Sequence, residues 1–275
     1  MNNNEGIYTA VLIETRISNI YEVVLDNFFK HLDKRWNFMI FCTNNNKDYL
    51  INLLNSKFEI DKYRTTIVAL DIDKPISIDT GCNGFVDYDY NKLMTCKLLY
   101  ELIPTEHILM FQLDTLLSDK YSNNIYNFLE YDYVGAPWEW NDYGGNGGLS
   151  LRKKSKMLEI INDKSYKYNL PNALYHEDGY FSEYPNINMP HCDIAKQFCV
   201  ESIFYDKSVG IHKAFCVFHH SSNEYKELET HFPKFKELHL RWCYLWSETE
   251  FKNEVKNDGS YKTDFFRKYE IINFN

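Results

Sequence analysis

Two neighbouring carboxylates, Glu177 and Asp178, stand in the stretch HEDGY at the start of a predicted helix. A positioned carboxylate can act as a general base that takes a proton from a reacting hydroxyl group. We expect one of the pair to face substrate in this role and the other to anchor locally or to bind substrate. The alternative is that both only stabilise the helix N-terminus through its dipole. A zinc-protease motif is excluded, because its second histidine would stand where the chain has Tyr180.

A second set of side chains could hold a divalent cation and a diphosphate. Asp114 ends the apolar run HILMFQLD, and carboxylate oxygen is the ligand that Mg²⁺ and Mn²⁺ prefer. The stretch GIHKAF places His212, whose imidazole can ligate a metal, beside Lys213, whose ammonium group can neutralise a diphosphate. The alternatives are that Asp114 caps the next turn and that His212 is a structural histidine. His219 and His220 are close enough in the sequence to be rival ligands.

Glycine concentrates in the stretch GGNGGLSL. The chain has eleven glycines, and this stretch holds four of them: Gly144, Gly145, Gly147 and Gly148. The pattern is neither a P-loop nor G-x-G-x-x-G. Since glycine lets a backbone or a ligand approach closely, we expect Gly147 and Gly148 to lie against a sugar-sized ligand; the alternative is a tight hairpin turn. The flanking Trp138, Trp140 and Tyr143 offer aromatic faces on which a sugar ring could stack.

The elements that must position these residues follow from the apolar pattern. The first part of the chain alternates β-rich runs with segments of helical period. The predicted strands cover 8–15, 36–43, 65–71 and 107–114, and the predicted helices cover 18–32, 47–56 and 90–103. This order predicts an α/β fold with a parallel sheet and helices on both faces, in which ligands bind at the carboxyl ends of the strands. Asp114 and Arg16 stand at such strand ends, and we expect Arg16 to face a nucleotide or its phosphates.

The pattern changes after residue 118. A short helix is predicted over 123–131, further helices in RKKSKMLEIIND, HEDGYFSEY and DIAKQFCVESIF, and a late strand in GIHKAFCVF. The tail from about 222 is rich in Lys, Glu and aromatic residues and has amphipathic helical character. We expect one domain over 1–220, with halves at 1–118 and 119–220, followed by a helical C-terminal appendix over 221–275.

Composition and charge restrict the functional class. The 275 residues carry a formal net charge of −9, which argues against a general nucleic-acid binder. The N-terminal stretch lacks the basic and apolar regions of a signal peptide, and no run reaches the length of a membrane helix. Seven cysteines without C-x-x-C spacing indicate reduced thiols, so a cytoplasmic location is expected and a structural zinc site is not. The abundance of Asn, Lys, Ile and Tyr suggests an AT-rich genome, so the location would be the host cytoplasm for a viral protein.

Seven pieces of the chain, taken in order, resemble a known family. They are VLIETR, YNKLMTCKLLYELIPTEHILMFQLDTLL, FLEYDYVGAPW, GNGGLSLRKKSKMLEI, HEDGYFSE, AKQFCVE and GIHKAF. Together, over roughly residues 8 to 215, they resemble a domain-of-unknown-function family of GT-A-type glycosyltransferases found in bacteria, fungi and large DNA viruses. The resemblance implies a GT-A-like, Rossmann-type fold. It implies a transferase of glycan biosynthesis that moves a sugar from a nucleotide-sugar donor to a hydroxyl of a glycan or protein acceptor.

The resemblance also implies roles for individual residues by similarity to inverting GT-A enzymes. The Asp-x-Asp metal motif of those enzymes falls on Gln112-Leu113-Asp114, where only Asp114 keeps its carboxylate. With His212 as the late ligand, Asp114 would hold Mn²⁺ or Mg²⁺, and Lys213 would contact the donor diphosphate. By analogy with animal galactosyltransferases, Asp178 would be the general base. Where relatives have His-Lys-Pro-Trp, this chain has HKAF.

Two alternatives to an inverting, metal-assisted transferase remain open. One is a retaining transferase of the glycogenin kind, which also uses a late His and Lys; the acidic pair favours inversion. The other is a catalytically silent glycan-binding module on a GT-A scaffold, since the first carboxylate of the metal motif is missing. Hydrolysis of a nucleotide-sugar in the presence of metal would separate an enzyme from a silent module.

Overall fold

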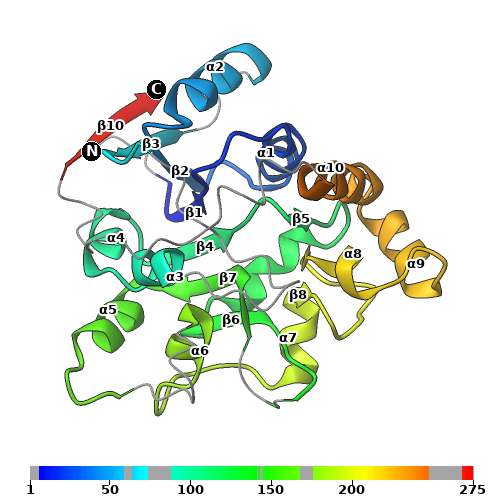
Figure 1. Cartoon of the computed structure of the whole chain (residues 1–275). Helices are drawn as coiled ribbons and strands as arrows, with labels where there is room; N and C mark the ends of the chain where they lie inside the picture. Colours follow the sequence, from blue (N-terminus) through cyan, green and yellow to red (C-terminus); the bar gives the residue numbers. More distant parts are fainter. Residues whose placement is uncertain are drawn as a thin grey trace.

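Four parallel strands form the centre of a larger sheet (Figure 1). They lie in the order β3-β2-β1-β4, with bounds β1 (Tyr8–Ile13), β2 (Trp36–Thr43), β3 (Thr65–Leu70) and β4 (His107–Phe111). The connections run through α1 (Ile20–His31), α2 (Lys47–Lys57), α3 (Tyr88–Met94) and α4 (Lys97–Leu102). All four predicted strands and their parallel arrangement are therefore confirmed. The helix predicted over 90–103 is two helices, because Cys96 has extended backbone angles (φ −77°, ψ 127°).

The computed structural model describes residues 6–58, 64–73, 88–140, 142, 145–167, 176–247 and 268–274. Tyr143 and Gly144, both named in the sequence analysis, lie outside these residues. In the described part no helix is long and apolar enough to cross a membrane.

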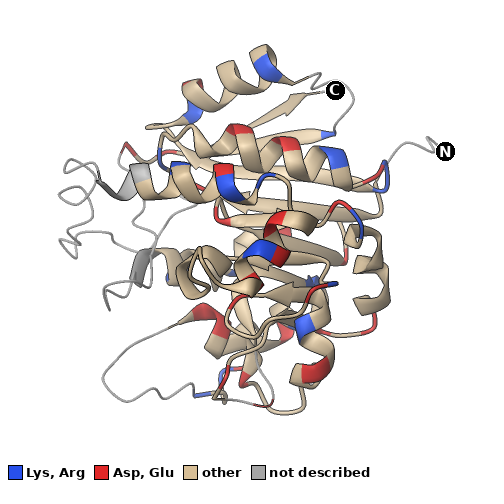
Figure 2. Ribbon diagram, turned by 90° about the vertical axis from the view of Figure 1, so that its right-hand side faces the viewer, with Lys and Arg blue, Asp and Glu red and all other residues tan. Residues whose placement is uncertain are grey.

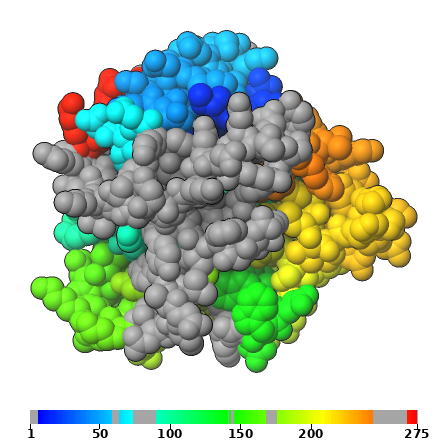
Figure 3. Space-filling model, in the orientation of Figure 1, coloured from blue at the N-terminus to red at the C-terminus, as the bar shows by residue number. Residues whose placement is uncertain are grey.

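Three antiparallel pairings extend the central strands to a seven-stranded mixed sheet of order β10-β3-β2-β1-β4-β7-β6. β7 (Asn146–Lys153) runs antiparallel to β4, β6 (Tyr133–Ala136) antiparallel to β7, and β10 (Tyr269–Phe274) antiparallel to β3. The predicted α/β class with helices on both faces is confirmed, whereas the sheet is less uniformly parallel than the sequence indicates. The C-terminal part contains the expected helices, α9 (Asn223–His231) and α10 (Phe235–Ser247), but also the unpredicted β10. Figure 3 shows this last strand, in red, on the side of the molecule where β3 and α2 lie.

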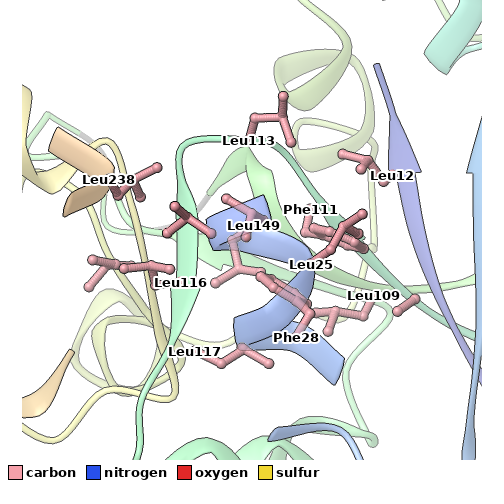
Figure 4. Close-up of a cluster of buried hydrophobic side chains, with 14 of the residues drawn as sticks. Leu12, Leu25, Phe28, Leu109, Phe111, Leu113, Leu116, Leu117, Leu149 and Leu238 are labelled. Carbon is pink, nitrogen blue, oxygen red and sulfur yellow. The ribbon is translucent and has the colours of Figure 1, made fainter. Parts of the chain in front are cut away.

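The two faces of the sheet are covered by different helices. Along β1, Ala10 and Leu12 belong to the core that includes buried residues of α1 and α2, whereas Val11 and Ile13 belong to the core under α3, α4, α5 (Lys154–Asn162) and α6 (Glu177–Ser182). This alternation follows from the two-residue period of a strand. Figure 4 shows the first core, where α1 packs on β4 and its neighbours through leucine and phenylalanine side chains.

A small second sheet lies beyond the end of β4. Its order is β5-β9-β8, with bounds β5 (Thr115–Leu117), β9 (Gly210–His212) and β8 (Cys199–Val200). The late strand predicted in GIHKAFCVF stops at His212, because Lys213 adopts a left-handed conformation (φ 48°) and α8 (Ala214–Val217) follows. The 3-10 helix η2 (Ser122–Phe128) and α7 (Cys192–Phe198) complete the described elements.

Positive and negative side chains are mixed along the helices and loops of the surface in Figure 2. Figure 2 shows Lys and Arg interspersed with Asp and Glu along the helices and loops in view. The formal charge of −9 is therefore not concentrated on one helix or loop of this view.

Candidate active site

The carboxylate of Asp114 lies against His212 and Lys213. Its Oδ1 is 3.5 Å from His212 Nε2, and its Oδ2 is 3.8 Å from Lys213 Nζ. The pairing of β5 with β9 places Thr115 opposite His212, and the Lys213 amide donates to the Asp114 carbonyl oxygen at 3.0 Å. The small sheet thus brings together two predicted stretches that are almost one hundred residues apart in the sequence.

Burial and neighbouring charges act in opposite directions on the pKa values of Asp114 and His212. Burial raises the pKa of Asp114, but His212 and Lys213 outweigh this effect and hold it at about 2. Burial lowers the pKa of His212, but Asp114 and then Glu201 outweigh it and raise the value to about 9. Glu201 Oε1 lies 3.4 Å from His212 Nδ1, so the imidazole sits between two carboxylates. Glu201 could not be recognised from the sequence, because it stands in AKQFCVE without a motif around it.

The donor atoms of Asp114 and His212 fit a divalent cation. Asp114 Oδ1 and His212 Nε2 are buried and make no hydrogen bond, although buried polar atoms are normally paired. Two donors that each lie about 2.1 Å from one ion are about 3.0–3.5 Å apart, close to the observed 3.5 Å. Among the described residues no third His, Cys, Asp or Glu joins them as a ligand group. Gln112, in the first motif position, instead donates its amide to Tyr90 Oη at 2.9 Å.

The rival histidines lie elsewhere. His219 and His220 are both exposed, and His219 Nδ1 pairs with the Ser221 hydroxyl at 2.7 Å. Of the three histidines that the sequence analysis names as ligands, His212 is the one that lies against Asp114.

Glu177 forms a buried ion pair with Arg152. The distances are 2.9 Å from Nη1 to Oε2 and 3.2 Å from Nη2 to Oε1, and neither side chain is more than 5% exposed. The Glu177 amide donates to Asn91 Oδ1 at 2.8 Å, which fixes the start of α6. Both carboxylate oxygens of Glu177 therefore have a partner inside the protein, which corresponds to local anchoring, one of the two roles expected for the second carboxylate of the pair.

Arg152 connects several parts of this site. Its guanidinium donates to Ser150 Oγ at 2.8 Å, to the Gly147 carbonyl oxygen at 3.3 Å and to Tyr100 Oη at 3.3 Å, besides Glu177. The sequence analysis missed this residue, since RKK resembles an exposed basic run. The helix predicted over RKKSKMLEIIND in fact begins at Lys154, and Arg152 lies on β7 two residues after Ser150, which places both side chains on one face of the sheet.

Asp178 is half-buried beside this ion pair. Its Oδ1 accepts from the Gly179 amide at 2.8 Å and its Oδ2 from the Gly147 amide at 3.4 Å. Burial, and next the charge of Glu177, raise the pKa of Asp178 to about 6, although the two backbone amides act in the opposite direction. A carboxylate with this pKa accepts a proton more readily near neutral pH than an ordinary aspartate does.

The part of β7 that holds Gly147 and Gly148, called the glycine strand below, separates two groups of ionisable residues. One group contains Glu177, Arg152 and Asp178, and the other contains Asp114, His212 and Lys213. A Cβ at Gly147 would collide with the Glu177 carboxylate, and a Cβ at Gly148 with the His212 ring. The last residue of β4, Phe111, pairs with Leu149, so both glycines extend past the carboxyl end of β4. The structure therefore gives both positions a reason for glycine inside the protein, namely the approach of an ion pair and of an imidazole.

Arg16 lies at the carboxyl end of β1, buried against Glu14. Its Nε and Nη2 donate to the Glu14 carboxylate at 2.8 and 2.6 Å. Burial lowers its pKa, but Glu14 and, more weakly, Asp114 outweigh this and raise it. Arg16 is thus a charged neighbour of the Asp114 group, in a position fixed by an acid that the sequence analysis did not name.

The tryptophans lie in the connection between β6 and β7. The rings of Trp138 and Trp140 are stacked, with centroids 5.9 Å apart and an interplanar angle of 11°. Trp140 is 78% exposed, which is unusual for a large apolar side chain. The pair offers a flat aromatic surface next to the start of the glycine strand.

Comparisons with solved structures find distant similarities in fold. Mouse xyloside xylosyltransferase 1 is similar at 10% identity and a TM-score of 0.47, over 77% of this chain and 99% of that one. The mannosyltransferase PcManGT from Pyrobaculum calidifontis, solved with GDP-Man and Mn²⁺, is similar at 13% identity and a TM-score of 0.42, over 65% and 51%. The 4-diphosphocytidyl-2C-methyl-D-erythritol synthase from Anaerococcus prevotii is similar at 10% identity and a TM-score of 0.39, over 66% and 92%. At these values the similarity says nothing of substrate or activity.

Comparisons of the sequence give one match. No curated protein matches the chain. Residues 83–212 match the family model DUF5672, described as a protein of unknown function. The resemblance to a domain-of-unknown-function family is thereby confirmed over these residues, which include every candidate site residue except Arg16, Lys213 and the rival histidines His219 and His220.

Proposed function

We propose that the protein transfers a sugar from a nucleotide-sugar to an acceptor hydroxyl, with inversion at the sugar carbon. The observation that carries the proposal is the pair of adjacent glycines past the end of β4. The Gly147 amide holds Asp178, and Gly148 faces His212, which contacts Asp114. A raised-pKa base and a cation-binding group therefore stand at neighbouring positions of one strand, at the edge where open α/β sheets bind ligands.

Asp178 acts as the general base in this reaction. The acceptor oxygen forms a bond to the sugar carbon, the bond from that carbon to the diphosphate breaks, and the hydroxyl proton passes to the Asp178 carboxylate. The Gly147 and Gly179 amides fix the direction of that carboxylate. Glu177, paired with Arg152, lies next to Asp178 in the sequence, and its charge contributes to the raised pKa of Asp178.

The leaving diphosphate is held by cationic side chains. The ammonium group of Lys213 neutralises its charge, and Arg16 contributes positive charge from the end of β1. Asp114 and His212 would hold Mn²⁺ or Mg²⁺, which when bound supplies further charge stabilisation to the diphosphate. The donor half is residues 1–118, and the half over 119–220 binds a glycan or protein acceptor on the Trp138–Trp140 surface.

The test is a transfer assay combined with donor binding. Purified protein is screened by thermal shift against nucleotide-sugars with and without Mn²⁺ or Mg²⁺, since ligand at about a hundred times its Kd stabilises by roughly 2.7 kcal/mol. With a donor identified, Asp178→Asn should lose about 10²–10⁴-fold in turnover and keep donor affinity. Asp193→Asn, a change at an exposed aspartate, is the control and should keep both. Full turnover in Asp178→Asn would remove the assigned base and favour the retaining mechanism.

A silent glycan-binding module is the second candidate. It is favoured by Gln112, whose amide is engaged by Tyr90 where a second metal-binding carboxylate is expected. Such a module would bind glycans through the exposed tryptophans yet neither transfer nor hydrolyse a nucleotide-sugar in the presence of metal. Release of nucleoside diphosphate from a bound donor excludes it.

A further inference from the structure

Three side chains with metal-binding chemistry meet outside the site described above: those of Asp142, His191 and Cys192. One ligand atom from each lies within 4.8 Å of the other two. In the part of the chain that the structure describes, no other three His, Cys, Asp or Glu side chains meet in this way. We propose that these three side chains bind a divalent transition-metal ion, for which Zn²⁺ is the best match.

The backbone already holds the two contributing segments together. Asp142 belongs to the connection between β6 and β7, whereas His191 and Cys192 stand at the start of α7. The Cys192 amide donates to the Asp142 carbonyl oxygen at 3.0 Å. Cys192 Sγ and His191 Nδ1 are 3.5 Å apart, about the separation of two donors in a tetrahedral zinc site. The approach of the two segments is thus set by a tertiary backbone hydrogen bond, and His191 Nδ1 also accepts from the Asp193 amide at 3.4 Å.

The chemistry of the three donors selects the metal. A thiolate, an imidazole and a carboxylate are the ligand types of zinc, and three protein ligands leave the fourth tetrahedral position to water. The thiol proton of Cys192 passes to solvent when the metal binds. The Asp114–His212 pair has no sulfur donor and favours harder cations, so the two sites differ in selectivity.

Binding at this site would connect the start of α7 to the segment that leads into the glycine strand. The same connection carries Trp138 and Trp140, so a bound ion at Asp142 would link the connection that holds this aromatic pair to α7. The proposal rests on these three side chains alone and does not depend on the proposed transfer reaction.

The experiment uses Co²⁺ as a spectroscopic substitute for zinc. Metal-free, reduced full-length protein is titrated with Co²⁺, and the absorption is recorded. We expect a thiolate-to-cobalt charge-transfer band in the near ultraviolet that saturates at one equivalent and disappears when Zn²⁺ is added. Cys192→Ser should lose the band, whereas Cys216→Ser, a change at an exposed cysteine outside this group, should keep it.

The other two ligands are tested by affinity. Substituting a residue that only hydrogen-bonds to a metal ligand lowers metal affinity by roughly 10–100-fold. His191→Ala and Asp142→Asn remove a ligand itself, so each should weaken Co²⁺ binding by more than this, whereas His220→Ala should leave it unchanged. Circular dichroism checks that each variant is folded, and if Cys192→Ser is not, His191→Ala decides. A titration without a thiolate band, or a band that persists in folded Cys192→Ser, overturns the proposal.

Discussion

Replacing Glu177 by glutamine tests whether its ion pair with Arg152 stabilises the fold around β7 and α6. The substitution keeps the shape of the side chain and removes its charge, so the guanidinium stays buried without a counter-ion. Breaking a buried ion pair in this way typically costs about 3–5 kcal/mol of unfolding free energy. We expect the lower value, about 3 kcal/mol, because Arg152 keeps its hydrogen bonds to Ser150, Gly147 and Tyr100.

Urea unfolding followed by circular dichroism measures this cost, and a thermal melt should show a fall of about 6–12 °C. The control is Glu101→Gln, which breaks the ion pair with Lys97 on the surface, where both side chains are more than 40% exposed. That change should cost at most about 0.5 kcal/mol.

A double replacement separates the buried charge from the lost contact. Arg152→Met with Glu177→Leu removes both charges and should cost less than Glu177→Gln alone, because no unpaired charge remains in the interior. The reasoning is refuted if Glu177→Gln costs no more than the surface control, or if the double variant costs as much as the two single changes added together.

The remaining predictions concern the base, the glycine strand and the cation-binding pair. Because only the ionised carboxylate of Asp178 accepts a proton and its pKa is about 6, transfer should rise about tenfold per pH unit up to pH 6 and then level off; Asp178→Asn should lack this inflection. Since that pKa is raised in the folded state, the contribution of this group to stability is fully present below its unfolded pKa of about 3.9 and is lost progressively as the pH rises to about 6. Melts of Asp178→Asn should therefore lack that part of the decline, and an identical decline would contradict the shift. Gly147→Ala should cost about 1–3 kcal/mol in urea unfolding, because the new Cβ meets the Glu177 carboxylate; a variant as stable as the parent would show that this space is not filled. Asp114→Asn should abolish Mn²⁺-dependent donor binding in calorimetry while the fold survives; unchanged binding would make Asp114 a structural residue.

Local patterns in the sequence were enough to predict the first half of the fold. The apolar runs of β1 to β4 are continuous because parallel strands are buried on both faces, and the helical period of α1 is equally clear. The edge strand β10 escaped prediction, since four of its six residues are exposed and its pairing with β3 comes from the opposite end of the chain. The late strand was predicted too long because nothing local signals the left-handed conformation of Lys213.

The sequence by itself determined which chemistry the chain could offer: an acidic pair, a strand-end aspartate, a His-Lys pair and glycines that permit close approach. Only the tertiary structure decided which of these groups meet. Asp114 and His212 are neighbours because β5 pairs with β9, and Glu177 differs from Asp178 in its partners because Arg152 of β7 forms an ion pair with it, whereas Asp178 accepts from two backbone amides. Periodicity records which face of an element is buried, but a contact between distant segments depends on strand pairing and on the pairing of buried charge, which no local pattern encodes.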